Sequence, residues 1–195
     1  SKEVINFLEG LANKARSFAS KDMDDLINYG HKLNIKDIEA WDIAYLSEKI
    51  KEERFNYSEQ EVKSYFPDHK VIEGLFKVVE TIYGIFIKKD TTEVWHKDVK
   101  FYKITNKSGG LIGYFYLDLY ARKNKRGGAW MDEAISKFKF DNEFAHPVAF
   151  LTCNFSEPIN NNFSLLTHDE VITLFHEFGH GLHHLLTEIN DYGVS

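Results

Sequence analysis

"TLFHEFGHGLHHLLTE", residues 173–188, carries four histidines within nine positions of a stretch that otherwise has the pattern of an interior helix. Upstream of it, Thr167 and Glu170 have the spacing of a capping box, which predicts a helix from His168 to about Leu186. We expect one face of this helix to pack on a core, because apolar residues recur along it at spacings of three and four: Val171, Leu174, Phe175, Phe178, Leu182, Leu185 and Ile189.

The opposite face of this helix is polar and holds Asp169, Thr173, His176, His180 and Thr187. A solvated helix face usually mixes Lys, Arg and Glu, and here Lys and Arg are missing. Residues four apart lie one above the other, with about 6 Å between their Cβ atoms, so His176 and His180 can reach one ion at about 2.0–2.1 Å from each nitrogen. The pattern His-Glu-x-x-His therefore predicts a zinc site with His176 and His180 as ligands.

Glu177 follows the first predicted ligand and lies about 100° around the helix from it. From there its carboxylate can lie beside a water held by the ion without entering the coordination shell. Zinc lowers the pKa of such a water to about 7, so Glu177 is the predicted general base and returns the proton to the leaving amine. Zinc is the expected cofactor because imidazole ligands, an open position and no redox requirement suit it.

A third protein ligand cannot be identified within the chain. His184 continues the row of the predicted ligands, but it lies about 12 Å of helical rise beyond His176, so the two cannot share an ion with His180 on a straight helix. Glu188 lies a similar distance beyond His180. The helix alone therefore supplies two ligands.

Other residues of this helix leave alternatives open. His183 and His184 either lie around the site, face a substrate or simply pack. Gly179 and Gly181 each cost about 1 kcal/mol of helix stability relative to alanine, which predicts that another backbone packs closely here.

The remaining chain predicts an α+β fold that is predominantly helical, with a small antiparallel sheet. Helical periodicity covers residues 3–19, 22–33, 37–55 and 69–83. After residue 83 the segments are short, β-branched and aromatic, which predicts strands in "GIFIKK", "VKFYKIT", "GLIGYFYLDLY" and "PVAFLTCNF". The basic segment "ARKNKRGGAW", residues 121–130, is interpreted as a solvated turn.

Composition excludes several classes of protein. Hydrophobic residues make up 43% of the 195 residues, enough for one sizeable core or two small ones. No apolar run approaches the roughly 20 residues of a membrane span, and the start lacks the pattern of a signal peptide. A net charge of −6 with scattered basic residues argues against a nucleic-acid partner. The lone cysteine, Cys153, fits a reducing compartment, so we expect a cytoplasmic protein.

Charge is unevenly distributed along the chain. No Lys or Arg follows Lys139, while eight acidic residues do, so the last 56 residues carry a formal charge of −8. Six of the nine histidines also lie there. This end of the chain is expected to attract a cation.

Several long segments carry a family resemblance: "WDIAYLSEKIKEERF", "VIEGLF", "GYFYLDLYARKNKRGGAWMD", "PVAFLTCNF" and "LLTHDEVITLFHEFGHGLHHLLTE". Together they resemble the thimet oligopeptidase family (M3) of zinc metallopeptidases, and within it the bacterial oligopeptidases and dipeptidyl carboxypeptidases. The resemblance implies hydrolysis of oligopeptides, not folded proteins, in a deep channel between largely helical lobes. It also implies His176 and His180 as zinc ligands and Glu177 as the catalytic base.

The family extends beyond the matched part on both sides. Its third zinc ligand is a glutamate about 25 residues after the second histidine, which in this numbering falls past Ser195. We therefore expect 1–195 to be a fragment of a zincin-like catalytic domain and, alone, a weak zinc binder and a poor catalyst. Its expected parts are a helical part (1–83), a small sheet (84–155) and a metal-binding helix (167–187).

Two further questions stay open at this stage. The alternative to an enzyme is a non-catalytic helical scaffold or a module that binds metal or peptide. These residues do not distinguish endopeptidase action from the release of C-terminal dipeptides. By analogy with the family, "PVAFLTCNF" is expected either at the cleft, paired with an extended substrate, or as an ordinary internal strand.

Overall fold

The computed structural model describes residues 1–56, 58–140, 143–158, 162–189 and 191. By its internal contacts the chain divides into two compact units, 1–61 and 62–195. Within the described residues, no helix combines the length and the apolar character needed to cross a membrane.

The first unit contains the helices α1 (Lys2–Lys32) and α2 (Ala40–Phe55), and the short helix α3 (Glu59–Lys63) spans the boundary. The prediction of two helices over 3–19 and 22–33 is wrong, because α1 is continuous. No proline or glycine interrupts the chain between them, so the backbone continues the helix although the apolar spacing shifts. Among the described residues of this unit only Gly30 and Leu46 are buried.

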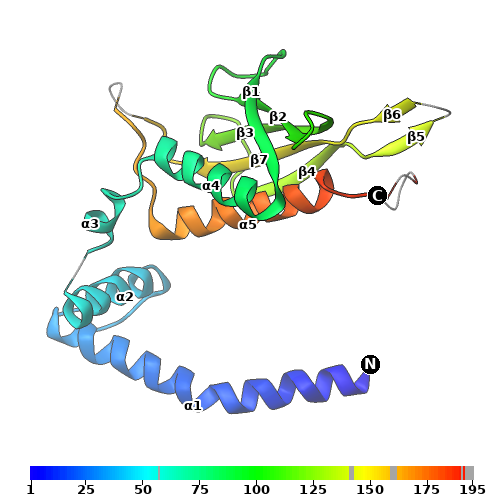
Figure 1. Cartoon of the computed structure of the whole chain (residues 1–195). Coiled ribbons are helices and arrows are strands. Elements are labelled where there is room, and N and C mark those ends of the chain that lie inside the picture. The colour runs from blue at the N-terminus through cyan, green and yellow to red at the C-terminus, as the bar shows by residue number, and fades with distance from the viewer. Residues whose placement is uncertain (57, 141–142, 159–161, 190, 192–195) are drawn as a thin grey trace. The chain divides into compact units, whose positions relative to one another are not determined.

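The second unit pairs two longer helices with β-structure (Figure 1). Its elements are α4 (Asp68–Tyr83), β1 (Ile85–Asp90), β2 (Lys100–Asn106), β3 (Leu111–Tyr120), β4 (Trp130–Ile135), β5 (Phe138–Phe140), β6 (Glu143–Ala145), β7 (Val148–Phe155) and α5 (His168–Leu185). Five strands form one sheet in the order β1-β2-β3-β7-β4, and β5 pairs with β6 separately. The four predicted strands are confirmed as β1, β2, β3 and β7.

The prediction of an antiparallel sheet is wrong in one pairing. Strands β3 and β7 run parallel, with Phe115 opposite Ala149, while the other neighbours in the sheet are antiparallel. The reason is the strand β4, which the sequence interpretation did not include. The chain leaves β3, runs as β4 along the far side of β7, and only then enters β7, so β7 lies between β3 and β4.

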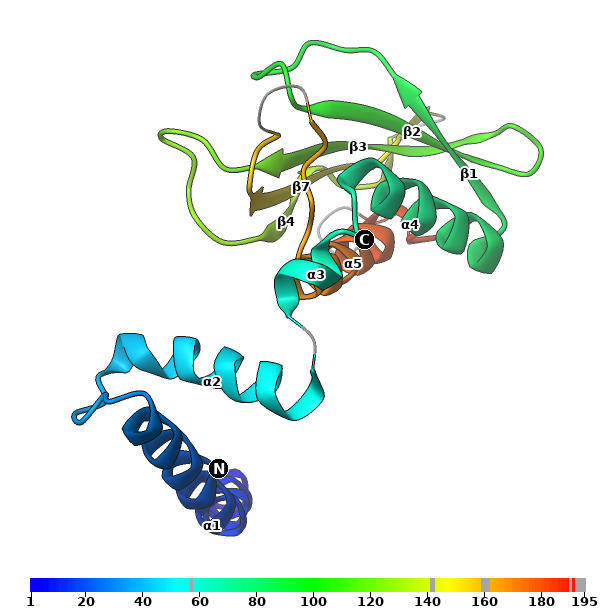
Figure 2. The same ribbon diagram turned by 90° about the vertical axis from the view of Figure 1, so that its left-hand side faces the viewer.

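One face of this sheet carries the core, and α4 and α5 both cover it (Figure 1, Figure 2). Three phenylalanine rings, one each from α4, β3 and α5, meet there. Phe76 of α4 lies 6.0 Å from Phe115 of β3 and 5.9 Å from Phe178 of α5, between ring centroids. Such aromatic contacts add to the free energy gained by burying the rings, and they hold α5 firmly on the sheet.

The helix α5 begins with the predicted capping box. The Thr167 hydroxyl accepts from the Glu170 amide at 3.0 Å, and the Glu170 carboxylate accepts from the Thr167 amide at 2.7 Å. The core stripe is buried at Leu174, Phe178, Leu182 and Leu185, and Val171 packs against it.

Two members of the predicted stripe are exceptions. Phe175 is 40% exposed because it lies at the margin of the stripe, and Ile189 is 48% exposed because α5 has already ended.

Candidate metal centre and catalytic site

The side chains of His176 and His180 lie on the exposed face of α5, one turn apart. Their Nε2 atoms are 3.1 Å apart, and their rings are nearly perpendicular, at 83°. Two nitrogens bound to one tetrahedral zinc ion at 2.0–2.1 Å would be about 3.3 Å apart. The spacing of this pair therefore fits a shared ion after a movement of a few tenths of an ångström.

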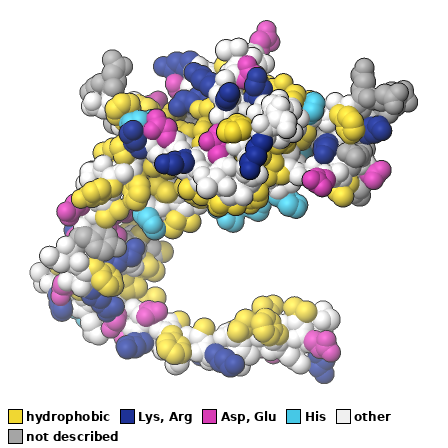
Figure 3. Space-filling model, viewed as in Figure 1, with side chains coloured by type: hydrophobic (Ala, Val, Ile, Leu, Met, Phe, Trp, Pro, Cys, Tyr) yellow, Lys and Arg dark blue, Asp and Glu magenta, His cyan; other side chains and the backbone are white. Residues whose placement is uncertain are grey.

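Histidine side chains gather along this surface of the helix (Figure 3). Within the described part of the chain, no group of three or more His, Cys, Asp or Glu side chains is arranged to hold a metal ion. The described residues thus offer two imidazole donors, and neither His184 nor Glu188 joins them.

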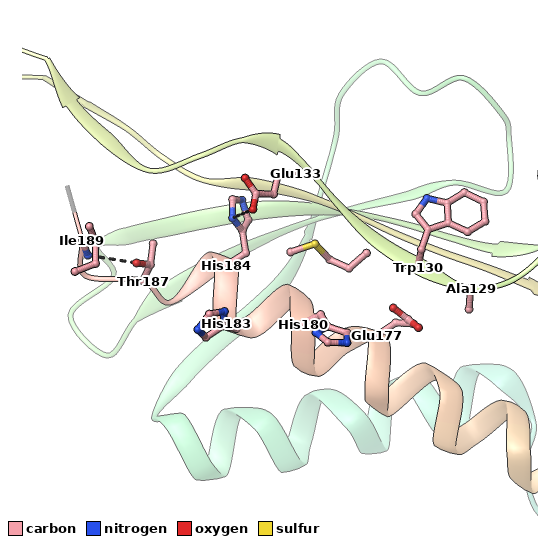
Figure 4. A pocket seen from close by; sticks show the side chains of 10 residues that line it. Ala129, Trp130, Glu133, Glu177, His180, His183, His184, Thr187 and Ile189 are labelled. Carbon is pink, nitrogen blue, oxygen red and sulfur yellow. Dashed lines mark hydrogen bonds and ion pairs between the residues drawn. The ribbon is translucent and has the colours of Figure 1, made fainter. Parts of the chain in front are cut away.

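Glu177 lies on the flank of α5 that faces the sheet and is only 9% exposed. It lines a cavity of about 560 Å³, together with His180, Ala129 directly before β4, and the first two residues of β4, Trp130 and Met131. Figure 4 shows its carboxylate projecting from the helix towards Ala129 and Trp130. The carboxylate is therefore held between the exposed histidines and the neighbouring strand.

The strand beside this cavity is β4, not β7. Within the described residues β4 is one of the two edge strands of the five-stranded sheet, the other being β1, while β7 has a partner on each side. Of the two alternatives for "PVAFLTCNF", the structure supports the ordinary internal strand, because neighbouring strands on both sides already use its backbone groups. The edge beside this cavity that a peptide could approach belongs to residues 130–135.

The adjacent histidines His183 and His184 of α5 differ from each other. His183 is exposed and lines the cavity. His184 is 4% exposed, and its ring points at β4, with Nε2 3.0 Å from the Ile135 carbonyl. Glu177, Gly181 and His184 follow one another at helical spacings of four and three residues. This pattern could have identified the flank from the sequence.

The glycines of α5 do not pack against another backbone, contrary to the prediction. A Cβ on Gly181 would lie 2.9 Å from Cδ2 of Leu151, a side chain of β7. A Cβ on Gly179 would meet nothing within 4 Å. Close packing of α5 on the sheet explains the first glycine, and no contact in the structure explains the second.

The basic segment before β4 is a turn with mostly exposed residues, as predicted, but two of its cations are paired with a buried carboxylate. Its Arg122 donates two hydrogen bonds of 2.7 and 2.8 Å to the Asp118 carboxylate, and Lys125 donates one of 2.8 Å. Trp95 adds a fourth at 3.1 Å. Burial of Asp118 raises the pKa of its carboxyl, but these donors outweigh it and lower the pKa to about 2.

Further hydrogen bonds fix the same segment to the sheet. Lys125, whose side chain is buried, also donates to the Tyr120 carbonyl at 2.8 Å. Asn154 of β7 donates to the carbonyls of Arg126 and Gly128 at 2.7 and 2.6 Å. The place where β4 begins is thus set by buried charges that the sequence interpretation missed. The available signal was a single acid inside an apolar strand, followed by Arg and Lys.

The only cysteine does not offer a nucleophile. Cys153 is buried in β7, and burial, followed by the negative charge of Glu177, raises the pKa of its thiol to about 12. At neutral pH the thiol is therefore protonated, and the thiolate is the reactive form.

Comparison with known proteins places this site in a family context. Residues 1–195 match the model of Peptidase family M3. Oligopeptidase A of Escherichia coli (strain K12) is 48% identical over 197 residues, covering 100% of this chain and 29% of the relative. Dipeptidyl carboxypeptidase of the same organism is 34% identical over 188 residues, covering 93% and 27%. Saccharolysin of Saccharomyces cerevisiae (strain ATCC 204508 / S288c) is 35% identical over 205 residues, covering 95% and 28%.

The chain thus spans under a third of the length of these relatives, while the relatives cover almost all of it. The match extends over both units and includes the helix with the paired histidines. The chain therefore belongs to peptidase family M3.

Proposed function

We propose that this chain is part of a zinc-dependent metallopeptidase that hydrolyses short peptides. His176 and His180 would hold the ion, and Glu177 would act as the general base. The observation that supports this most is the geometry of α5, where two Nε2 atoms lie 3.1 Å apart and a buried carboxylate lines the cavity beside them. The names of the relatives, oligopeptidase A and dipeptidyl carboxypeptidase, support peptides as substrates.

The proposed chemistry divides between the ion and the chain. When bound, zinc acts as a Lewis acid that polarises the peptide carbonyl and acidifies a water molecule. Glu177 takes the proton from the attacking water and gives it to the amine that leaves. Between the walls of the cavity, α5 and β4, this side chain is only 9% exposed, which limits its access to bulk water.

The edge strand β4 would align the substrate. An extended peptide can add to an exposed sheet edge through main-chain hydrogen bonds, and β4 is the edge strand that lines the cavity. Its beginning is fixed by the Asp118 cluster and its backbone runs past Glu177. A peptide bound there would present a carbonyl carbon to the water molecule that Glu177 deprotonates.

The decisive experiment replaces the base in the full-length protein. Glu177→Gln keeps the shape of the side chain but cannot accept a proton, so we expect kcat for a short peptide to fall at least about 100-fold with zinc content unchanged. Glu188→Gln is the matched control, because this exposed carboxylate lies outside the cavity, and it should leave cleavage unchanged. Unchanged cleavage by Glu177→Gln would refute the proposed function.

The remaining expectations form part of the same proposal. Residues 1–195 would be part of a zincin-like catalytic domain, in a cytoplasmic enzyme that acts on oligopeptides. By itself the chain would bind zinc weakly, because its described residues offer two donors. Zinc titration of the 195-residue chain tests this, and tight binding with three protein ligands would contradict it. Metal binding without peptide turnover by the full-length protein would favour the alternative, a metal-binding module.

A further inference from the structure

His184 joins the proposed metal-binding helix to the edge strand beside the cavity. It lies on the same flank of α5 as Glu177 and is 4% exposed. Its Nε2 lies 3.0 Å from the Ile135 carbonyl, and its Nδ1 lies 3.7 Å from a carboxylate oxygen of Glu133. Figure 4 shows the ring turned from the helix towards Glu133.

The partners of the ring determine what it does in its neutral form. A backbone carbonyl can only accept, so Nε2 carries the proton and donates it to Ile135. Nδ1 is then buried without a hydrogen-bond partner, because 3.7 Å to Glu133 is too long. A buried polar atom without a partner is unfavourable, so a residue needed only for packing would be apolar here. The donated hydrogen bond is the feature that requires a histidine.

This hydrogen bond acts at a weak point of β4. The strand pairs regularly with β7 up to Glu133, and its register then shifts before Ile135, where the pairing ends. Nearby, Lys137 donates to the Thr187 carbonyl at 2.8 Å, which is a second tie between the two segments. The beginning of β4 is fixed by the Asp118 cluster, and its end depends on α5.

We propose that His184 is a positioning residue for the edge strand. Its Nε2–H bond to Ile135 fixes the end of β4 against α5 and so sets the width of the cavity that Glu177 lines. The strand is then already ordered before a peptide binds along it. The consequence for catalysis rests on the proposed function, whereas the consequence for the strand does not.

The test compares three substitutions in the full-length protein. His184→Gln places an amide N–H near the position of Nε2, while His184→Leu has no donor and His184→Asn has one that reaches only the position of Nδ1. For Leu and Asn we expect KM for a short peptide to rise roughly three- to tenfold with kcat nearly unchanged, and for Gln a KM close to wild type. Hydrogen exchange of residues 130–136 should accelerate in the Leu and Asn variants and stay near wild type in Gln.

The control is Glu188→Gln, because this carboxylate is exposed and lies outside both β4 and the lining of the cavity. It should leave both KM and exchange unchanged. The proposal would be overturned if β4 exchanged at the wild-type rate in both the Leu and the Asn variant. It would also be overturned if β4 exchanged as fast in the Gln variant as in the Asn variant. The exchange measurement needs no turnover, so it stands even if Glu177→Gln disproves the peptidase function.

Discussion

The two faces of α5 carry different properties on one helix. On one face Leu174, Phe178 and Leu182 are buried against the sheet, and on the other His176 and His180 are exposed. Between them runs the flank with Glu177 and His184, buried but polar. Stability is therefore concentrated on one face and the proposed chemistry on the other, and substitutions on the two faces should have separable effects.

The largest expected effect is on the core face. Phe178→Ala removes a ring that contacts Phe76 and Phe115, and it should lower the free energy of unfolding by about 3–5 kcal/mol. The matched variant on the other face, His176→Ala, should change the stability of the metal-free protein by less than about 0.5 kcal/mol. Urea unfolding after metal removal measures both. Equal losses of unfolding free energy in the two variants would show that substitutions on the two faces do not have separable effects.

The next effect concerns the cluster that positions β4. Asp118→Asn leaves the buried Lys125 and the partly exposed Arg122 without a counter-charge, so we expect a loss of about 3 kcal/mol.

The stability of this cluster should also depend on pH. Because the folded pKa of Asp118 is lowered to about 2, its carboxylate stabilises the fold fully above the unfolded value near 4, and this stabilisation is lost as the pH falls from about 4 through 2. The Asn variant should lack that part of the acid transition. Identical acid-unfolding curves for wild type and variant would contradict the role of the cluster.

A smaller effect distinguishes the two glycines of α5. A Cβ at Gly181 must displace Leu151, so Gly181→Ala should cost about 1–3 kcal/mol in thermal unfolding. The opposite outcome, a more stable protein, would mean that α5 packs less closely on β7 than the structure shows.

The smallest effect has the opposite sign. A Cβ at Gly179 meets open space, so Gly179→Ala should stabilise the protein by up to about 1 kcal/mol through helix propensity. The same thermal unfolding measurement applies. Destabilisation would reveal a contact at this position.

Local patterns in the sequence were sufficient for much of this helix. Thr167 and Glu170 fixed its start, and the spacing of Leu174, Phe178 and Leu182 identified its buried face, because both signals depend on residues within one or two turns. The local spacing of four residues also predicted that His176 and His180 lie side by side on the helix. Their role as ligands stays a prediction.

Features that depend on distant residues could not be predicted in the same way. The parallel pairing of β3 with β7 depends on β4, whose residues 130–135 follow a basic segment that resembles a turn. That segment is ordered by Asp118, and whether an acid inside a strand meets Arg122 and Lys125 is decided by tertiary packing. The carbonyl that His184 contacts belongs to Ile135 on β4, so this contact also depends on tertiary packing.

The most direct test of the paired-histidine site is anomalous diffraction at the zinc edge from crystals of the full-length protein. We expect one peak about 2.0–2.1 Å from Nε2 of both His176 and His180, on the exposed face of α5 and beside Glu177. A zinc peak elsewhere, with these two imidazoles not coordinating it, would contradict the proposed metal centre and with it the role of Glu177.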